Sequence, residues 1–214
     1  MKLSTLSGFF IFGILLSGCL TIKETYSFKK NGAGTMTYEV AFNKVDDTFQ
    51  DVKHDLLPNT WSLDSLAEVI SLIPGITKVA LTSAKDHQGF GLSFRFESLT
   101  SLNHALSRIL LTDSTEVFSY FRKENGVWLR AYKADRMMIS ESFVNKARGE
   151  RQVAAMLSQL GYEVEMQFPK TIAVAYTGAE GMISGRKNKT LNMRATFQEI
   201  AATDQPLSAT ILLD

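Results

Sequence analysis

Cys19 is the residue whose type and position point most directly to chemistry, because it is the only thiol in the 214 residues. It follows Leu-Ser-Gly at residues 16–18, which close an apolar run that begins at Leu6, and Lys2 places one positive charge before that run. A positive start, an apolar middle and small residues before a cut are typical of a secretory signal. We therefore expect the chain to be cleaved near Cys19.

The segment Leu16-Ser17-Gly18-Cys19 resembles the lipobox of bacterial lipoproteins. The resemblance implies cleavage before Cys19, thioether lipidation of the Cys19 sulfur with a lipid that carries acyl chains (palmitate is a typical one), and a membrane as the partner of those chains. It also implies a location in the bacterial cell envelope. Stable attachment takes two or more signals, and lipoproteins of this kind carry more than one chain on the modified cysteine.

The apolar run and the cysteine have two alternative interpretations. A membrane-spanning helix needs about 20 apolar residues, and the run that begins at Leu6 is shorter. An ordinary secretory signal followed by a free cysteine stays open. Because Leu20 rather than Asp follows Cys19, the sorting habit of lipoproteins favours the periplasmic face of the outer membrane if the host is Gram-negative.

The residue types that catalyse reactions or bind metals are scattered along the rest of the chain. His54, His87 and His104 have no second ligand at metal-binding spacing. The acids at positions 46, 47 and 51 lack the regular spacing of a calcium loop, and Ser184 lies in no Gly-x-Ser-x-Gly motif. We therefore expect a protein that is not an enzyme, with no catalytic residues, no metal and no cofactor.

Length and charge limit the classes of partner. Without residues 1–18, 196 of the 214 residues remain, which suits one sizeable domain. Lys2 is the only charged residue that is removed, so equal numbers of basic and acidic residues are left. A neutral chain has no bulk attraction to nucleic acid, and we expect no nucleic-acid partner. With one cysteine, no disulfide can form within the chain.

Alternating apolar residues predict many strands, and apolar residues at helical spacing predict three helices. The predicted strands are residues 20–30, 34–43, 76–83, 89–96, 117–122, 127–132, 164–168, 172–176, 191–197 and 211–213, and the predicted helices are 63–73, 99–110 and about 140–160. Asn-Gly sequences at residues 31–32 and 125–126 predict hairpin turns. Gly161 predicts the C-cap of the third helix. The glycines at positions 178, 181 and 185 predict a loop.

This order of elements predicts an α+β fold, in which antiparallel sheets built from hairpins alternate with three helices packed on one face. Residues 34–123 alone follow the order β-α-β-β-α-β, which is compatible with a ferredoxin-like unit. We expect residues 1–18 to be the signal peptide and residues 19–214 to be a single α+β envelope domain. A subdivision near residues 134–142 is the alternative.

Aromatic and methionine side chains recur on several of the predicted strands. The residues that could line an apolar site are Phe90, Phe94, Phe96, Met166, Phe168, Met193 and Phe197. An ordinary core explains them, and a pocket for a lipid tail is the alternative, since ligand pockets are lined mainly by apolar and aromatic groups and Met adapts to its occupant.

Two segments also resemble a loose group of bacterial lipoproteins that includes the mycobacterial LppM-like domain. The first runs from Cys19 through the turn at residues 31–35, and the second covers residues 164–169, 178–189 and 191–197. The resemblance implies lipid binding, and it carries over no functional residue except Cys19. We therefore expect a lipid-anchored, non-catalytic envelope protein that binds an apolar or lipid-like ligand. An envelope scaffold that binds a protein partner is the alternative.

Overall fold

The structure, a computed structural model, describes residues 20–42, 63–83, 88–110, 117–131, 155, 157–178, 183–202 and 207–214. Within these residues it is a mixed α+β fold with eleven strands in two sheets and three helices. The expected α+β class is therefore confirmed. Cys19 and the rest of the lipobox lie outside the described residues, as do residues 132–154. The expectation of one domain over residues 19–214 stays a prediction.

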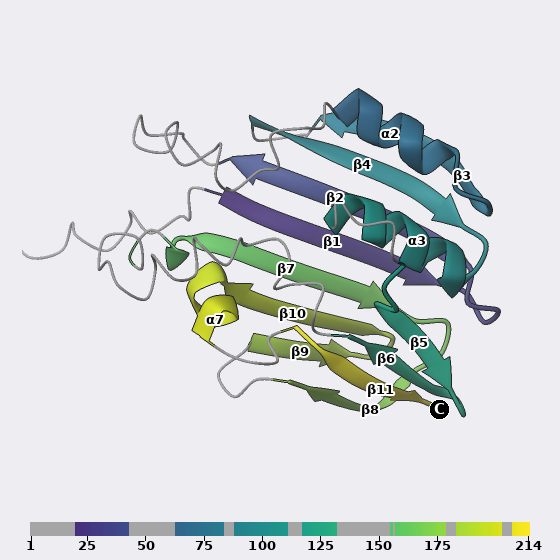
Figure 1. Cartoon of the computed structure of the whole chain (residues 1–214). Coiled ribbons are helices and arrows are strands. Elements are labelled where there is room, and N and C mark those ends of the chain that lie inside the picture. Colours follow the sequence, from purple (N-terminus) through teal and green to yellow (C-terminus); the bar gives the residue numbers. More distant parts are fainter. Residues whose placement is uncertain are drawn as a thin grey trace, which may run out of the picture.

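The larger sheet has seven strands in the order β3-β4-β2-β1-β7-β10-β9 (Figure 1). They are β1 (Leu20–Phe28), β2 (Gly34–Phe42), β3 (Ile76–Ser83), β4 (Gln88–Phe96), β7 (Leu160–Gln167), β9 (Ile183–Lys187) and β10 (Thr190–Thr196). Neighbouring strands are antiparallel except β1 and β7, which run parallel. The chain therefore places its first described strand in the centre of the sheet.

The predicted hairpin between β1 and β2 is confirmed. Gly32 has a φ of +86°, a left-handed conformation that glycine adopts without strain. The Lys29 amide donates to the Ala33 carbonyl at 2.7 Å, and the Gly32 amide donates to the Lys29 carbonyl at 3.1 Å. These bonds close the turn and set the register in which Phe28 lies opposite Gly34.

The smaller sheet has four strands in the order β5-β6-β11-β8. They are β5 (Phe121–Glu124), β6 (Val127–Arg130), β8 (Ile172–Thr177) and β11 (Ala209–Leu213). The predicted turn at Asn125-Gly126 is also confirmed, because both residues have positive φ, 51° and 84°. Type I′ hairpin turns require this conformation at both central residues, and Asn-Gly adopts it readily.

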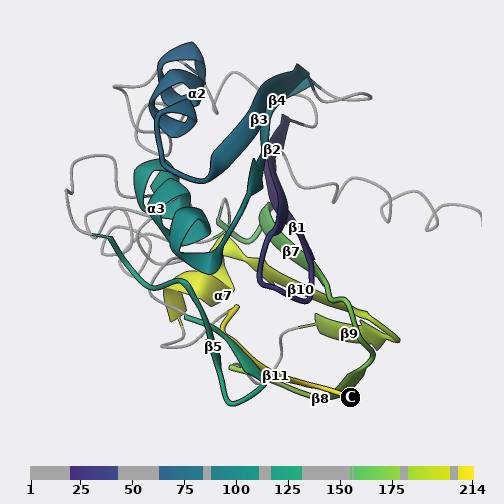
Figure 2. The ribbon, with the colours of Figure 1, turned by 90° about the vertical axis from the view of Figure 1, so that its right-hand side faces the viewer.

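One face of the larger sheet carries the core, and two kinds of element cover it (Figure 2). The helices α2 (Leu63–Ser71) and α3 (Leu99–Leu110) contact the β3 and β4 side, and the smaller sheet covers the β1 and β7 side. The third helix, α7 (Phe197–Ala202), contacts β7 and β10. The expectation of three helices on one face is not confirmed, because most of the third predicted helix lies outside the described residues.

The ferredoxin-like arrangement is wrong. The last strand of that unit, β5, joins the smaller sheet, and β1 takes the place beside β2. Which strands become neighbours depends on pairing between segments that are far apart in the sequence, and the local periodicity of the sequence does not indicate this pairing.

Other local predictions are also wrong. Leu160 and Gly161 belong to β7 instead of ending a helix, because pairing with Leu20 and Thr21 of β1 outweighs the preference of glycine for a C-cap. Gly185 lies in β9, where a loop was expected, and the strand predicted from residue 117 begins at Phe121. Within the described residues, no helix has the length and apolar character needed to cross a membrane.

Candidate functional site

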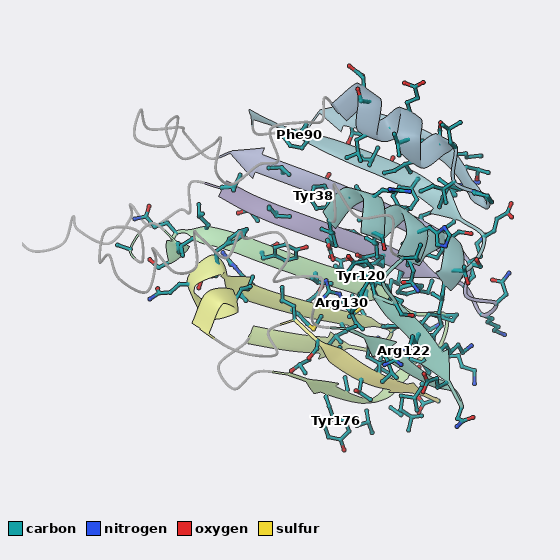
Figure 3. The ribbon with its side chains drawn as sticks, viewed as in Figure 1. Tyr38, Phe90, Tyr120, Arg122, Arg130 and Tyr176 are labelled. Carbon is teal, nitrogen blue, oxygen red and sulfur yellow. The ribbon has the colours of Figure 1, made fainter. Side chains whose placement is uncertain are left out.

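A buried ion pair joins the two sheets. Glu24 of β1 is 0% exposed and Arg130 of β6 is 4% exposed, and Arg130 Nη2 donates to Glu24 Oε2 at 2.8 Å. The other terminal nitrogen, Nη1, donates to the Leu207 carbonyl at 2.5 Å. Arg130 lies inside the molecule between the sheets (Figure 3). The side chain therefore links β1 to the smaller sheet and to the segment that leads into β11.

Two tyrosines complete the shell around the Glu24 carboxylate. Tyr26 donates to Oε2 at 2.8 Å, and Tyr162 of β7 donates to Oε1 at 2.6 Å. Together with Arg130 this gives the carboxylate three donors. A buried charge is tolerated when it is both paired and hydrogen-bonded. We interpret this group as a structural cross-link, because its acceptor atoms are engaged and closed off from solvent.

Tyr38 of β2 faces the same interior (Figure 3). Burial raises the pKa of its hydroxyl far above the usual range, and the negative charge of Glu24 raises this pKa further. Both causes disfavour the phenolate. Tyr38 is therefore a neutral hydroxyl at any physiological pH, and it adds no second negative charge beside the Glu24 carboxylate.

The residues predicted to line an apolar site lie in the core. Phe94, Phe96, Met166, Phe168, Met193 and Phe197 are buried, and Phe90 is partly buried against them. The ring centroids of Phe96 and Phe168 lie 5.9 and 5.4 Å from the ring centroid of Phe28. The ring centroid of Phe197 lies 6.2 Å from that of Tyr162. Phe96, Phe168 and Phe197 therefore pack on other rings, and the lining of a ligand pocket by the seven residues stays a prediction.

The Glu24 cluster was missed by the sequence analysis, although a signal was present. Ile22, Tyr26 and Phe28 share one face of the first strand because they alternate along it, and Glu24 has the same parity. A charged residue at a core-facing position of a strand is uncommon and indicates a buried partner. The partner itself, Arg130, is 106 residues away in the chain, so no local pattern identifies it.

Leu20, the residue directly after Cys19, is the first residue of β1 and is 1% exposed. The register places it opposite Phe42 of β2 and Leu160 of β7. We call this end of the larger sheet the Leu20 end. The opposite end, which carries the hairpin at residues 29–33, lies about 30 Å away, because a strand rises about 3.3 Å per residue.

Titratable side chains do not form a metal site in the described part of the chain. No group of three or more His, Cys, Asp and Glu residues comes together there. His54, His87 and the acids at positions 46, 47 and 51 lie outside the described residues. The prediction that the protein needs no metal is therefore not tested by this arrangement.

No family model and no curated protein matches this chain. Among solved structures, the chain is similar to the folded domain of the LppM protein of Mycobacterium tuberculosis, determined by NMR. The TM-score is 0.40 and the sequence identity 9%, over 92% of each chain. This neighbour carries the name of the group that the two segments resemble.

Proposed function

We propose that this protein is a lipid-anchored, non-catalytic component of the bacterial cell envelope. The observation that carries the proposal is the segment Leu16-Ser17-Gly18-Cys19 directly before β1. A diacylated cysteine holds a protein on a membrane by itself, whereas one acyl chain binds only marginally. Because Leu20 follows Cys19, we place the protein on the periplasmic face of the outer membrane if the host is Gram-negative.

The geometry of β1 supports an anchor at this position. With Leu20 buried and paired on both sides, no flexible linker separates Cys19 from the fold. Acyl chains on Cys19 would hold the Leu20 end of the larger sheet against the bilayer. The hairpin at residues 29–33 would then face away from the membrane, at the far end of β1.

Substitution of the cysteine tests the anchor. In cells that make the natural full chain, Cys19→Ala is expected to move the protein from the membrane fraction to the soluble fraction. Thr21→Ala, two residues further on, is the matched control and should leave the protein in the membrane fraction. Membrane association of the Cys19→Ala protein that survives a high-salt wash would contradict the proposal.

The proposed ligand is apolar or lipid-like. The support for it is the set of seven aromatic and methionine residues, of which Met166 and Met193 have the most adaptable side chains. Since those side chains fill the core, binding would require the two sheets or their helices to part. Native mass spectrometry of the protein from its host should detect a co-purified lipid. Protein that is free of lipid, and that stays free after incubation with host lipid extract, would contradict this part of the proposal.

A protein partner is the second candidate, and two exposed apolar side chains favour it. Leu72, just after α2, is 76% exposed, and Leu81 of the edge strand β3 is 40% exposed. Exposed apolar residues and an unpaired strand edge are common features of protein interfaces. If a partner docks there, Leu72→Asp with Leu81→Lys should abolish its crosslinking in the envelope. Unchanged crosslinks would exclude this surface.

A further inference from the structure

The outer face of the smaller sheet carries a row of four side chains, one from each strand. Arg122 of β5 lies opposite Leu129 of β6, Leu129 lies opposite Thr210 of β11, and Thr210 lies opposite Tyr176 of β8. Residues directly opposite each other in a sheet point to the same face. Their inward neighbours Phe121, Trp128, Ala209 and Ile211 are buried, so this row faces solvent.

A groove with a volume of about 400 Å³ follows this row. Ligand sites in proteins have volumes of about 300–1,000 Å³. The four residues of the row line the groove together with Ala131, Thr177, Gly178 and Ser208, and with Arg130 and Ala209 beneath them. Arg122 and Tyr176 lie apart from each other at the edges of this sheet (Figure 3). Three spacings between strands separate them, or about 14 Å.

The positive charge on this face of the groove comes from Arg122. Among the described residues that line the groove, Arg122 and Arg130 are the charged ones and none is a carboxylate, and the Arg130 side chain is buried on the inner side. The buried carboxylate of Glu24 neutralises Arg130 from the inner side. Arg122 is exposed, and its Nη1 lies 3.5 Å from Glu124 Oε1. An exposed ion pair of this kind contributes little to stability, so an anion in the groove can compete for the guanidinium.

The opposite edge of the groove offers a flat ring. Tyr176 is 71% exposed, although burying a tyrosine ring is normally favourable. Thr210, whose side chain has a hydroxyl group, lies in the row between Tyr176 and Arg122, and Ser208 also lines the groove. A sugar ring has one apolar C–H face that stacks on an aromatic ring, and a rim of hydroxyls that pair with hydroxyl groups. A sugar ring spans about 5 Å, so bridging the two edges takes two to three rings.

We propose that this groove binds an anionic oligosaccharide of two to three rings. One ring stacks on Tyr176, and a carboxylate at the other end pairs with Arg122. Hydrogen bonds to charged groups are worth about 1.5–3 kcal/mol, and each 1.4 kcal/mol is a tenfold change in affinity. The site does not depend on the acyl anchor, because the groove residues come from β5, β6, β8 and β11 and from the segments beside them.

Titration of the purified full chain with trigalacturonic acid tests the site, with binding followed by calorimetry or by NMR shifts of groove residues. We expect binding that weakens as salt rises, since an ionic contact is screened. Maltotriose has the same number of rings without the charge, and galacturonic acid has the charge on a single ring. Both should bind at least tenfold more weakly. Equal binding of either sugar, or no binding of the trimer at millimolar concentration, would overturn the proposal.

Variants separate the two ends of the groove. Arg122→Gln and Tyr176→Ala should each raise the dissociation constant about tenfold. Tyr176→Phe keeps the ring and should bind nearly as well as the natural chain. Arg95→Gln removes an exposed arginine from the larger sheet and is the matched control for charge. An equal loss of affinity in Arg95→Gln and Arg122→Gln would show a general charge effect and would overturn the site.

Discussion

Glu24 and Arg130 are the residues at which a single substitution should most affect stability. Both charges are removed from water, which costs several kcal/mol per ion unless each is paired. Here the carboxylate has three donors, and the guanidinium reaches both Glu24 and the Leu207 carbonyl. Loss of either partner leaves the other charge buried without compensation.

We therefore predict that Arg130→Met lowers the free energy of unfolding by about 3–5 kcal/mol. Urea unfolding of the full chain, followed by tryptophan fluorescence, measures this change because Trp128 lies in the core beside the pair. Arg122→Met is the matched control on the neighbouring strand. Its arginine is exposed, so the change there should stay below about 1 kcal/mol.

Combining Arg130→Met with Glu24→Gln shows whether the loss of stability in Arg130→Met comes from the unpaired charge of Glu24 or from lost packing. Gln keeps an oxygen that accepts from Tyr26 and Tyr162 but carries no charge. The double variant should be more stable than Arg130→Met alone, because no buried carboxylate remains unpaired. Strictly additive losses would show that the two side chains do not interact as the structure indicates.

Tyr38 makes stability depend on alkaline pH. Its pKa is raised in the folded protein by burial first and by Glu24 second, and in the unfolded chain the hydroxyl ionises near its usual pKa of about 10. As the pH rises, the unfolded state therefore loses this proton before the folded state does. The contribution of Tyr38 to the free energy of unfolding is fully present below about pH 10 and is lost as the pH rises above it. Melting temperatures of the natural chain should fall more steeply above pH 10 than those of Tyr38→Phe. Identical profiles would contradict the assignment.

At the scale of the element, side chains cap the starts of two of the described helices, α3 and α7. Ser98 Oγ accepts a hydrogen bond from the Ser101 amide at 3.1 Å, at the start of α3. Thr196 and Glu199 form a reciprocal pair at the start of α7: the Glu199 amide donates to Thr196 Oγ1 at 3.2 Å, and the Thr196 amide donates to Glu199 Oε2 at 2.6 Å. Each cap satisfies amides that would otherwise lack partners.

Ser98→Ala should lower the free energy of unfolding by about 1 kcal/mol, because the Ser101 amide loses its acceptor. Chemical denaturation measures the effect. Thr100→Ala changes an exposed residue of the same first turn that is not the cap, and it should change stability by less than about 0.5 kcal/mol. A larger loss in Thr100→Ala than in Ser98→Ala would contradict the capping role.

Local chemistry decided which elements could be predicted. The two confirmed hairpins contain Asn-Gly, and α3 has apolar residues at regular helical spacing. The helix α7 was missed although Thr-Phe-Gln-Glu at residues 196–199 is a capping-box sequence. β9 was missed because Gly185 disfavours a strand, and pairing with β10 outweighs that preference.

The candidate sites depend on long-range pairing, which local patterns do not contain. Glu24 meets a partner 106 residues away. The row from Arg122 to Tyr176 exists only because β11 lies between β6 and β8. The residues selected from the sequence for an apolar site are those with regular alternation, and the same alternation is what a packed core requires.

At the scale of the whole molecule, the central strand begins where the anchor would be attached. Leu20 is paired on both sides and buried, so a force on Cys19 would act on the middle of the larger sheet. The groove lies on the outer face of the other sheet, which places ligand binding and attachment on separate parts of the fold. A lipid-anchored binding protein needs such a separation, because the bilayer would otherwise cover its site.

The most direct test of this account is the mass of the first tryptic peptide of the natural protein, purified from its host membranes. Trypsin cleaves after Lys23, so an anchored protein should yield residues 19–23 with acyl groups on Cys19 and no residue before it. The expected peptide is apolar and heavier than its amino-acid sequence by the mass of more than one acyl chain. An unmodified Cys19, or a first residue at any other position, would contradict the central claim.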